Sequence, residues 1–428
     1  YLILTSKRDA HLSSVVERWV LTGAFMQRGI VFGLVGPAIM VGSTLWATTA
    51  QVQHIEKSSG GGFTQVVTTT DRDVKTIFVS GQVGQGDNLE EHVESAFQGV
   101  VNRLEQAGAS VDDVVKIRIF VKNFEPDQYA VVAGVRRETF TEDHWPASTM
   151  IGVRSLYRDS LRVEIEAIAV VAEPGIDLTI ERFNPSNGFS GAVAVTAHGV
   201  RTVYVSGQVS DDDDLTTQIA SVWKRVEQQL ATAGASMTDI VKATTYIVDF
   251  DPETDLEAYR TGRKQVLDLT DMPASTLLGI PALAREQFKV EIDAIAVLGV
   301  NEESVTRTFI DPATGFSQAM TVQGSGDKVI QISGQVGQPG DTLKNQADQV
   351  YANLRQRLET SGGSVEDLLK IVIYMPNYRP GDFAVLNAAR QRHGFPDSTV
   401  PAATLLGIQS LFAADALLEI EGVAVVDR

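Results

Sequence analysis

The most restrictive feature of this sequence is a long segment that occurs three times. Each copy has an apolar run that ends in Ser-Gly-Gln, and the runs recur at intervals of 126 and 127 residues (80 to 206 to 333). Solenoid units usually span about 20–50 residues, so a period this long predicts one small domain per repeat. The repeated landmarks are Ser80, Gly81 and Gln82; Ser206, Gly207 and Gln208; Ser333, Gly334 and Gln335; Lys116, Lys242 and Lys370; and the Pro-Ala dipeptides at Pro146, Pro273 and Pro401.

The repeats predict four parts in the chain: an N-terminal segment at 1–57 and domains at 58–174, 175–302 and 303–428. The first repeat predicts the order β-β-α-β-α-β-β, because alternating apolar runs flank two stretches with helical spacing. This order indicates an α+β fold in which two helices cover one face of a sheet. Three tethered copies can cover each other's remaining faces, which predicts a pseudo-trimer within one chain. In the first repeat the predicted strands are 63–69, 76–80, 115–121, 148–153 and 162–171, and the predicted helices are 89–107 and 127–140.

Composition excludes several classes of site. The chain has no cysteine, which excludes disulfides, thiolate metal ligands and cysteine nucleophiles. Its six histidines show no ligand spacing, so we expect neither a metal nor a cofactor. The formal charge is -18, and such an acidic surface repels phosphate backbones, so we expect no nucleic-acid partner. The run Asp211–Asp214 is best interpreted as the solvated first turn of a helix, favoured by the helix dipole.

The N-terminal segment differs from the repeats. No charged residue occurs between Gly29 and Gln53, and 21 mostly apolar residues at 30–50 would span about 30 Å as a helix, the thickness of a bilayer core. We therefore predict a transmembrane helix at about 29–52 in contact with membrane lipid. A cleaved signal sequence and a core helix are the alternatives. The basic residues before this run predict a cytoplasmic or matrix-side N-terminus, and hence an extracytoplasmic head. Residues 57–62, rich in serine and glycine, predict a flexible tether.

The order and spacing of these landmarks resemble the RidA/YjgF/UK114 family over residues 63–427, three times in succession. The resembling motifs are Ser-Gly-Gln after an apolar strand, a strand opened by lysine, Pro-Ala, and a closing Glu-Ile-acid strand at Glu164, Glu291 and Glu419. The resemblance implies a chorismate-mutase-like α+β domain that forms trimers, with ligand clefts between neighbouring subunits. Here one chain would supply the whole trimer.

The resemblance also implies an activity, the hydrolysis of reactive imines and enamines with release of ammonia. In active members an arginine directly after Pro-Ala binds the substrate carboxylate, and the first glutamate of Glu-Ile-acid positions water. This sequence has Ser148, Ser275 and Ala403 after Pro-Ala, and a serine hydroxyl does not replace a guanidinium. Three arginines that follow in the next loop offer a possible replacement, although the third repeat has none there: Arg154, Arg158 and Arg285.

Each candidate residue has a structural and a functional interpretation. Glu164, Glu291 and Glu419 are either water-positioning carboxyls or strand acids that shape the pseudo-trimer. The Ser-Gly-Gln turns either need a small residue at a strand exit or direct backbone donors at a ligand. Ser148 and Ser275 suit a small polar ligand, whereas Ala403 gives the third cleft a different lining.

Because the arginine is absent and the three clefts differ, we predict a membrane-anchored binding or accessory subunit of a membrane protein complex, in which deaminase activity has been lost, rather than an enzyme. The alternative is a divergent imine or enamine deaminase, or a related small-molecule hydrolase. A small-molecule sensor is a third hypothesis.

Overall fold

Each repeat folds into a six-stranded sheet with two helices on one face. The computed structural model describes residues 51–58 and 62–427. In the first domain the sheet order is β1-β2-β3-β6-β4-β5, and only β4 and β5 run parallel, because α2 connects them as a crossover. The elements are β1 (Gln53–Lys57), β2 (Thr64–Asp71), β3 (Val74–Val83), α1 (Leu89–Gln106), β4 (Val114–Lys122), α2 (Tyr129–Thr139), β5 (Ala147–Val153) and β6 (Val163–Ala172).

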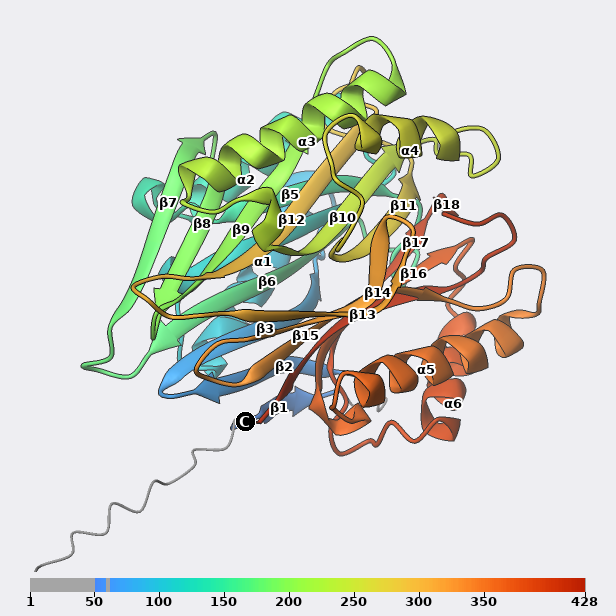
Figure 1. Cartoon of the computed structure of the whole chain (residues 1–428). Coiled ribbons are helices and arrows are strands. Elements are labelled where there is room, and N and C mark those ends of the chain that lie inside the picture. Colours follow the sequence, from blue (N-terminus) through green and yellow to red (C-terminus); the bar gives the residue numbers. More distant parts are fainter. Residues whose placement is uncertain (1–50, 59–61, 428) are drawn as a thin grey trace, which may run out of the picture. The chain divides into compact units, whose positions relative to one another are not determined.

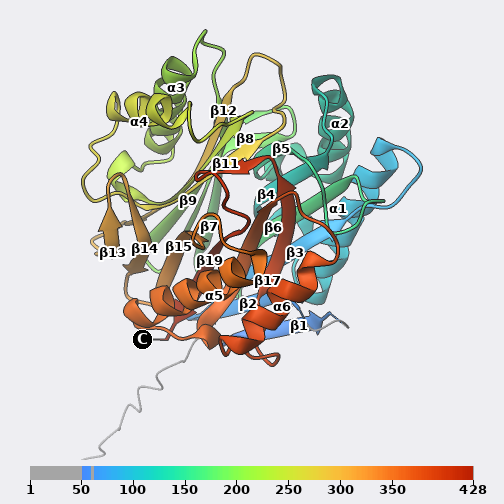
Figure 2. The same ribbon diagram turned by 90° about the vertical axis from the view of Figure 1, so that its right-hand side faces the viewer.

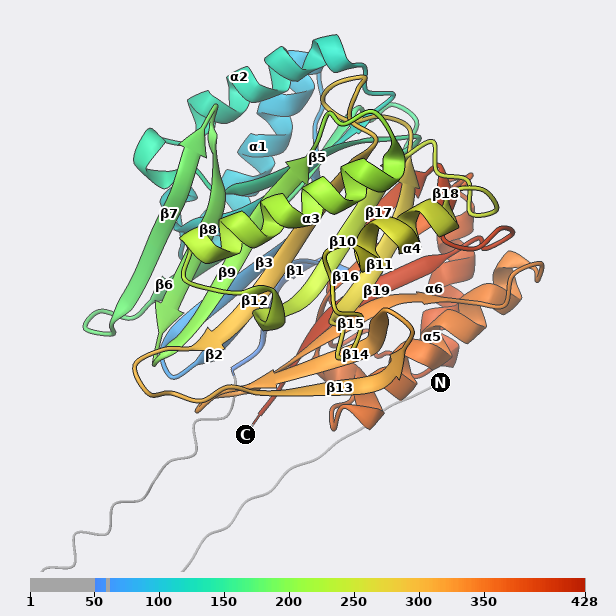
Figure 3. The same cartoon turned by 45° about the horizontal axis from the view of Figure 1, so that its top comes forward.

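The second and third domains repeat this plan. In Figure 3, α3 lies across β9 and β12, which it also contacts. The second domain contains β7 (Leu178–Ser186), β8 (Phe189–Ala197), β9 (Val200–Val209), α3 (Leu215–Thr232), β10 (Ile240–Val248), α4 (Leu256–Lys264), β11 (Ala274–Ile280) and β12 (Val290–Gly299). The third contains β13 (Thr306–Ala313), β14 (Phe316–Gln323), β15 (Lys328–Val336), α5 (Leu343–Thr360), β16 (Leu368–Pro376), α6 (Asp382–Arg392), β17 (Ala402–Ile408), β18 (Ser410–Leu411) and β19 (Glu419–Val426).

The first helix of each domain begins and ends where local chemistry dictates. In α1 the Asn88 side chain accepts a hydrogen bond from the backbone N–H of Glu91, which caps the helix start. Gly108 follows the helix end with a φ of +76°, a conformation that favours glycine. The apolar face buries Val93 and Phe97 against the sheet. In α3 the cap is Asp214, so the Asp211–Asp214 run lies directly before the helix and not in its first turn.

Each domain also begins with a strand that the sequence did not predict. β1 pairs antiparallel with β2, and β7 and β13 pair in the same way with β8 and β14. Lys57, the first residue of the predicted tether at 57–62, is the last residue of β1, and residues 59–61 lie outside the described residues. Gln51 also exchanges two backbone hydrogen bonds with Thr70, both 3.2 Å long. The described end of the predicted transmembrane segment is thus hydrogen-bonded to β2.

The rest of the predicted transmembrane segment at 29–52 lies outside the described residues. Within 51–58 and 62–427, no helix is both long and apolar enough to cross a bilayer. The membrane anchor therefore stays a prediction.

The three sheets join into a closed ring. One backbone pair links β5 to β8, another links β11 to β14, and a third returns from β17 to β2. At each link the carbonyl of a Pro-Ala proline accepts an N–H from the next domain: Pro146 from Ser190 (2.9 Å), Pro273 from Ser317 (3.1 Å) and Pro401 from Thr64 (3.0 Å).

This closure confirms the predicted pseudo-trimer. The helix pairs lie outside the strands (Figure 1), and in Figure 2 the pairs α1–α2, α3–α4 and α5–α6 are distributed around the central sheets. Each domain has its own core between helices and sheet, and a further core forms where β4, β5, β10, β11, β16 and β17 meet.

Candidate active site

The predicted site residues meet at the three places where one domain joins the next. We call these places junctions and number them by chain order. Junction I joins domains 1 and 2, junction II joins domains 2 and 3, and junction III joins domain 3 back to domain 1. The predicted residues that define them are Ser148, Ser206, Gly207 and Glu291 in junction I; Ser275, Ser333, Gly334 and Glu419 in junction II; and Ala403, Ser80, Gly81 and Glu164 in junction III.

The serine of Ser-Gly-Gln is a connector between domains. In junction I the Ser206 hydroxyl accepts the backbone N–H of Ser148 (2.7 Å) and donates to the carbonyl of Ser190 (2.5 Å). Ser333 binds the backbone of Ser275 in the same way, and Ser80 that of Ala403. These three serines are fully buried and occupied by backbone partners. Their geometry suits the structural interpretation.

The glycine of Ser-Gly-Gln leaves room for the glutamate. A Cβ at Gly81 would lie 1.7 Å from Oε1 of Glu164, and a Cβ at Gly207 would lie 1.7 Å from Oε1 of Glu291. Gly334 approaches Glu419 even more closely. The register of β3 on β6 shifts between Val79 and Gln82, so the turn bulges where the carboxyl sits. A side chain at this position would displace the carboxyl.

The glutamine that follows turns away from the carboxyl. The Gln82 side chain donates to the carbonyl of Ser80 (2.9 Å), and the Gln335 side chain donates to that of Ser333 (3.0 Å). Gln208 makes the same bond to Ser206 (3.1 Å). These amides stabilise the bulged turn, which suits a structural role.

The three glutamates are buried acids that hold a proton at neutral pH. Burial raises the pKa of Glu164, Glu291 and Glu419 each to about 8. The neighbouring domain opposes this by donating backbone N–H groups, from Leu405 to Glu164 and from Met150 to Glu291. Oε2 of Glu164 and of Glu419 has no hydrogen-bond partner among the described residues. A protonated carboxyl with an available oxygen is suited to general acid–base chemistry near neutral pH.

Sequence reasoning missed a buried arginine at each junction. Arg136 of α2 is 2 % exposed, and it donates to the Ser148 hydroxyl (3.0 Å) and to the Asn187 carbonyl (2.9 Å). Its guanidinium therefore reaches the residue after Pro-Ala from a helix instead of from the strand. Burial lowers the pKa of Arg136, and Glu291 lies close enough to oppose that shift.

The same helix position carries Arg263 in domain 2 and Arg390 in domain 3. The interval is 127 residues each time (136 to 263 to 390), a signal that was present in the sequence. Arg263 donates to the Gly315 carbonyl and lies 5.0 Å from the centre of the Tyr259 ring. Within the described residues, neither Arg136 nor Arg263 forms a salt bridge with an acid, and Nε of each lacks a partner. A buried guanidinium without a carboxylate is suited to binding a carboxylate ligand.

Junction III differs from the other two. Arg390 pairs with Asp397 and donates to the carbonyl of Phe395 (2.7 Å), so its charge is already balanced. Ala403 supplies no hydroxyl at the position of Ser148. The three arginines that the sequence suggested as replacements are all exposed: Arg154, Arg158 and Arg285.

The repeated lysines form a ring of ion pairs between the domains. Lys116 binds Asp293 (3.3 Å), Lys242 binds Glu421 (2.7 Å) and Lys370 binds Glu166 (2.8 Å), with each acid contributed by the next domain in the ring. The acids are the second ones of the Glu-Ile-acid motifs, and each also accepts a bond from a buried threonine: Thr149, Thr276 or Thr404.

One cation in this ring has no counterpart. Arg118 binds Glu166 (2.5 Å) and Glu421 (3.2 Å), while the equivalent positions hold Thr244 and Val372. Although burial opposes ionisation, Arg118 and Lys370 keep the pKa of Glu166 low, at about 2. No group of acids and histidines within 51–58 and 62–427 has the geometry of a metal site.

Comparison with known proteins matches the sequence to a family. The family described as Endoribonuclease L-PSP matches residues 55–171, 179–298 and 306–426. A 2-iminobutanoate/2-iminopropanoate deaminase from Dermatophagoides farinae is 34% identical over 104 residues, which is 22% of this chain and 78% of that protein. A RutC family protein from Pyrococcus abyssi is 34% identical over 90 residues, which is 21% of this chain and 67% of that protein.

A solved structure resembles nearly the whole ring. A chorismatase crystal structure superposes with a TM-score of 0.51 at 13% identity, covering 83% of this chain and 99% of that one. At this identity the likeness shows the fold alone. The three family matches together extend over most of the sequence. The chain therefore belongs to the Endoribonuclease L-PSP family, also called RidA/YjgF, and carries three of its domains in tandem.

Proposed function

We propose that this protein is a Rid-like hydrolase of small imine or enamine acids that works at junctions I and II. One observation carries this proposal. At junction I the Arg136 guanidinium donates to the Ser148 hydroxyl, and Glu291, a carboxyl with a raised pKa, lies close enough to influence Arg136. The family resemblance placed the arginine after Pro-Ala, where this chain has serine. A guanidinium supplied by α2 restores the missing charge from a different element.

The proposed reaction balances with water as the only co-substrate. Arg136 binds the carboxylate of the imino acid. The protonated Glu291 donates its proton to the imine nitrogen, and the resulting carboxylate takes a proton from the water that attacks the carbon. Glu291, protonated again, donates to the amine of the tetrahedral carbinolamine and takes the hydroxyl proton back, so ammonia leaves and the carbon keeps the oxygen as a carbonyl. A pKa of about 8 suits a group that both gives and takes a proton near neutral pH.

Substrate access involves the turn between β7 and β8. Asn187 accepts a bond from Arg136 through its carbonyl, and a Cβ on Gly188 would lie 3.4 Å from Nε of Arg136. This turn therefore covers the guanidinium, and a substrate carboxylate would replace the Asn187 carbonyl as its partner. In junction II the turn at Gly315 covers Arg263 in the same way.

The test measures ammonia released from 2-iminopropanoate by the full chain. The double variant Glu291→Gln/Glu419→Gln is expected to lose about 100-fold or more in rate, because general acid–base groups typically contribute that much. The matched control is Glu164→Gln in junction III, which is expected to keep the rate within about twofold. Arg136→Met should raise KM, and Arg390→Met should not. A wild-type chain no faster than the uncatalysed reaction, or an equal loss in the double variant and in Glu164→Gln, would overturn the proposal.

A second candidate is an accessory subunit that acts by binding. The uncharged run at 30–50 supports it, because such a run suits contact with membrane lipid. Junction III supports it as well, since Arg390 is paired with Asp397 and Ala403 has no hydroxyl. In this proposal the head lies on the extracytoplasmic side and docks on other subunits of a membrane protein complex. Extraction in mild detergent followed by native electrophoresis tests it. Co-migration with other subunits at fixed stoichiometry is expected, and migration as a lone chain would contradict it.

A further inference from the structure

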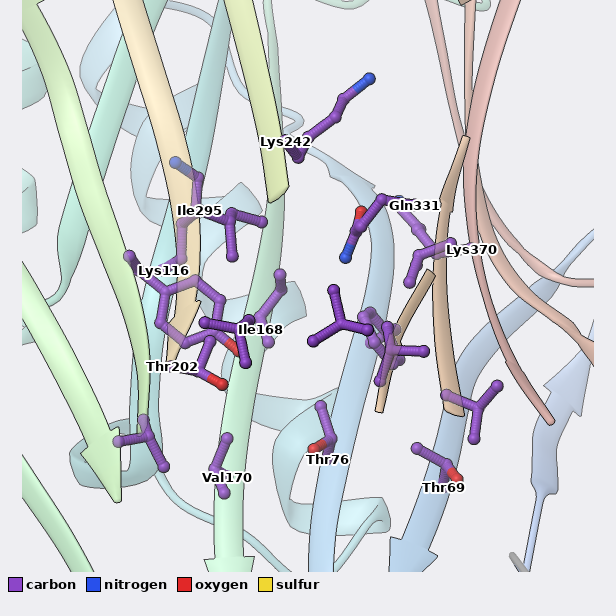
Figure 4. Close-up of a pocket in the computed structure, with 18 of the residues that line it drawn as sticks. Thr69, Thr76, Lys116, Ile168, Val170, Thr202, Lys242, Ile295, Gln331 and Lys370 are labelled. Carbon is purple, nitrogen blue, oxygen red and sulfur yellow. The ribbon is translucent and has the colours of Figure 1, made fainter. Parts of the chain in front are cut away.

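A cavity that the proposed chemistry does not use lies at the centre of the ring. Its volume is about 290 Å³, and strands from all three domains line it. Figure 4 shows Lys116 and Lys242 toward one end, Thr69 and Val170 toward the other, and Gln331 between them. We call this space the axial cavity. By the volume of liquid water it has room for about ten molecules, the size of a small metabolite.

The walls of the axial cavity are mainly aliphatic. They come from equivalent positions on β6, β12 and β19, each of which contributes a pair of β-branched aliphatic residues. Highly polar metabolites would lose hydration against such walls without recovering it. The wall residues are Ile168, Val170, Ile295, Val297, Val423 and Val425.

Polar groups break the threefold pattern in the middle of the cavity. The equivalent positions on β3, β9 and β15 hold Phe78, Tyr204 and Gln331, and all three line the space. Neither the Tyr204 hydroxyl nor the Gln331 amide makes a hydrogen bond to any part of the chain that the structure describes. Figure 4 shows the Gln331 amide directed into the space between the strands. A purely hydrocarbon occupant would leave both groups without partners, at a cost.

The inner end of the cavity carries a surplus of positive charge. Its lining includes three lysines and Arg118, four cations in all, against three carboxylates. The surplus is due to Arg118, whose counterparts Thr244 and Val372 are uncharged. Since each buried charge is best matched by an opposite one, this end favours an anion. The carboxylates are Glu166, Asp293 and Glu421.

Contacts between three hairpin turns lie at the outer end of the cavity. The Arg72 guanidinium donates to the Ser325 hydroxyl (2.7 Å), and the Arg72 carbonyl lies 2.9 Å from Nε2 of His198. These residues belong to the β2–β3, β14–β15 and β8–β9 connections.

We propose that the axial cavity binds one small amphipathic carboxylic acid, with its hydrocarbon part against Ile168, Ile295 and Val423 and its carboxylate at the end that holds Arg118. The Tyr204 hydroxyl and the Gln331 amide supply hydrogen bonds midway. This site is distinct from the junctions and does not depend on their proposed chemistry.

Isothermal titration of the full chain with 3-phenylpropanoate tests the proposal, with 3-phenylpropan-1-ol as the uncharged control of the same skeleton. One molecule of the acid is expected to bind per chain with a Kd below about 1 mM, and the alcohol at least tenfold more weakly. Binding that is lost in Arg136→Met would place the acid at a junction instead, which would overturn the proposal. Failure of the acid to bind would overturn it as well.

Two variants locate the binding. Val297→Phe fills the cavity and is expected to weaken binding at least tenfold, while ammonia release stays unchanged. Tyr204→Phe removes one hydroxyl without adding volume and is expected to weaken binding several-fold, which provides a test even if the larger substitution fails to fold. Arg136→Met should leave this binding intact. Unchanged affinity in both cavity variants would contradict the proposal, whatever the outcome at the junctions.

Discussion

Glycine at the centre of each Ser-Gly-Gln turn decides where a buried carboxyl can lie. Gly207→Ala would place a Cβ 1.7 Å from Oε1 of Glu291. We expect a loss of about 1–3 kcal/mol in unfolding free energy, because overpacking must move the carboxyl or the strand. Ammonia release should fall as well.

The matched control is Gly381→Ala, where an added Cβ meets nothing within 4 Å and φ is -68°. It should change stability by less than about 0.5 kcal/mol. Urea unfolding of both variants measures the difference, and equal effects would show that the close approach to Glu291 is not what requires glycine.

The raised pKa of Glu291 predicts a stability that depends on pH. The carboxyl ionises near 4.5 when unfolded and near 8 when folded, so the unfolded chain releases its proton first. This group therefore lowers stability as pH rises from 4.5 to 8, by up to about 1.4 kcal/mol per pH unit. Glu291→Gln should match the wild type near pH 4.5 and exceed it at pH 7.5 in urea unfolding. A difference in stability between Glu291→Gln and the wild type that stays constant with pH would refute the raised pKa of Glu291.

At the level of single residues, the sequence indicated most of the candidate site residues but not how they lie relative to one another. It proposed Glu291 and Ser148 separately as cleft residues, and the structure places both at junction I. It missed Arg136, because the resemblance drew attention to the residue after Pro-Ala, and a helix can reach the same point from elsewhere. The interval of 127 residues shared with Arg263 and Arg390 was available and would have identified all three.

Among secondary-structure elements, the buried strands and the helices of the first repeat were predictable to within about three residues, the largest difference being at the end of β3. The first strand of each domain was not, because β1, β7 and β13 lie at sheet edges, where partly exposed residues do not alternate clearly. Pro185 within β7 adds a further signal against a strand, although an edge position tolerates it.

The connection between β5 and β9 provides a test at this level. Ser206→Ala removes the acceptor for the buried N–H of Ser148 and the donor to the carbonyl of Ser190. An unsatisfied buried donor costs about 1–3 kcal/mol, so we expect a loss of that size in urea unfolding. Ser186→Ala, at an exposed serine of β7, is the control and should be close to neutral. Equal stability of the two variants would show that Ser206 does not hold the domains together.

For the whole molecule, the repeat period predicted three domains and their ring. It did not predict the ion pairs, because Lys116 and Asp293 lie far apart in sequence and meet only when neighbouring domains dock. Removing one partner of such a pair leaves the other charge buried and unpaired. Asp293→Leu is therefore expected to cost about 3–5 kcal/mol, and Lys116→Met/Asp293→Leu less than that single change. A double variant as unstable as Asp293→Leu would contradict this reading.

An exposed pair is the control for the ring. Lys344 and Asp348 lie 3.1 Å apart on α5, and the lysine side chain is 64% exposed. Lys344→Met should therefore change the unfolding free energy by no more than about 1 kcal/mol. A comparable loss at this surface pair would mean that burial is not what makes the ring pairs important.

Arg118 shows what covalent fusion permits. In an assembly of identical subunits, any residue facing the symmetry axis occurs in triplicate, so one arginine there would bring two more of the same charge to the same place. A single chain with three unequal copies can instead place one arginine opposite a threonine and a valine. Each copy can then change without forcing the same change on the others. The charge at the centre of the molecule can therefore be concentrated on one side, which threefold symmetry forbids in a trimer of identical subunits.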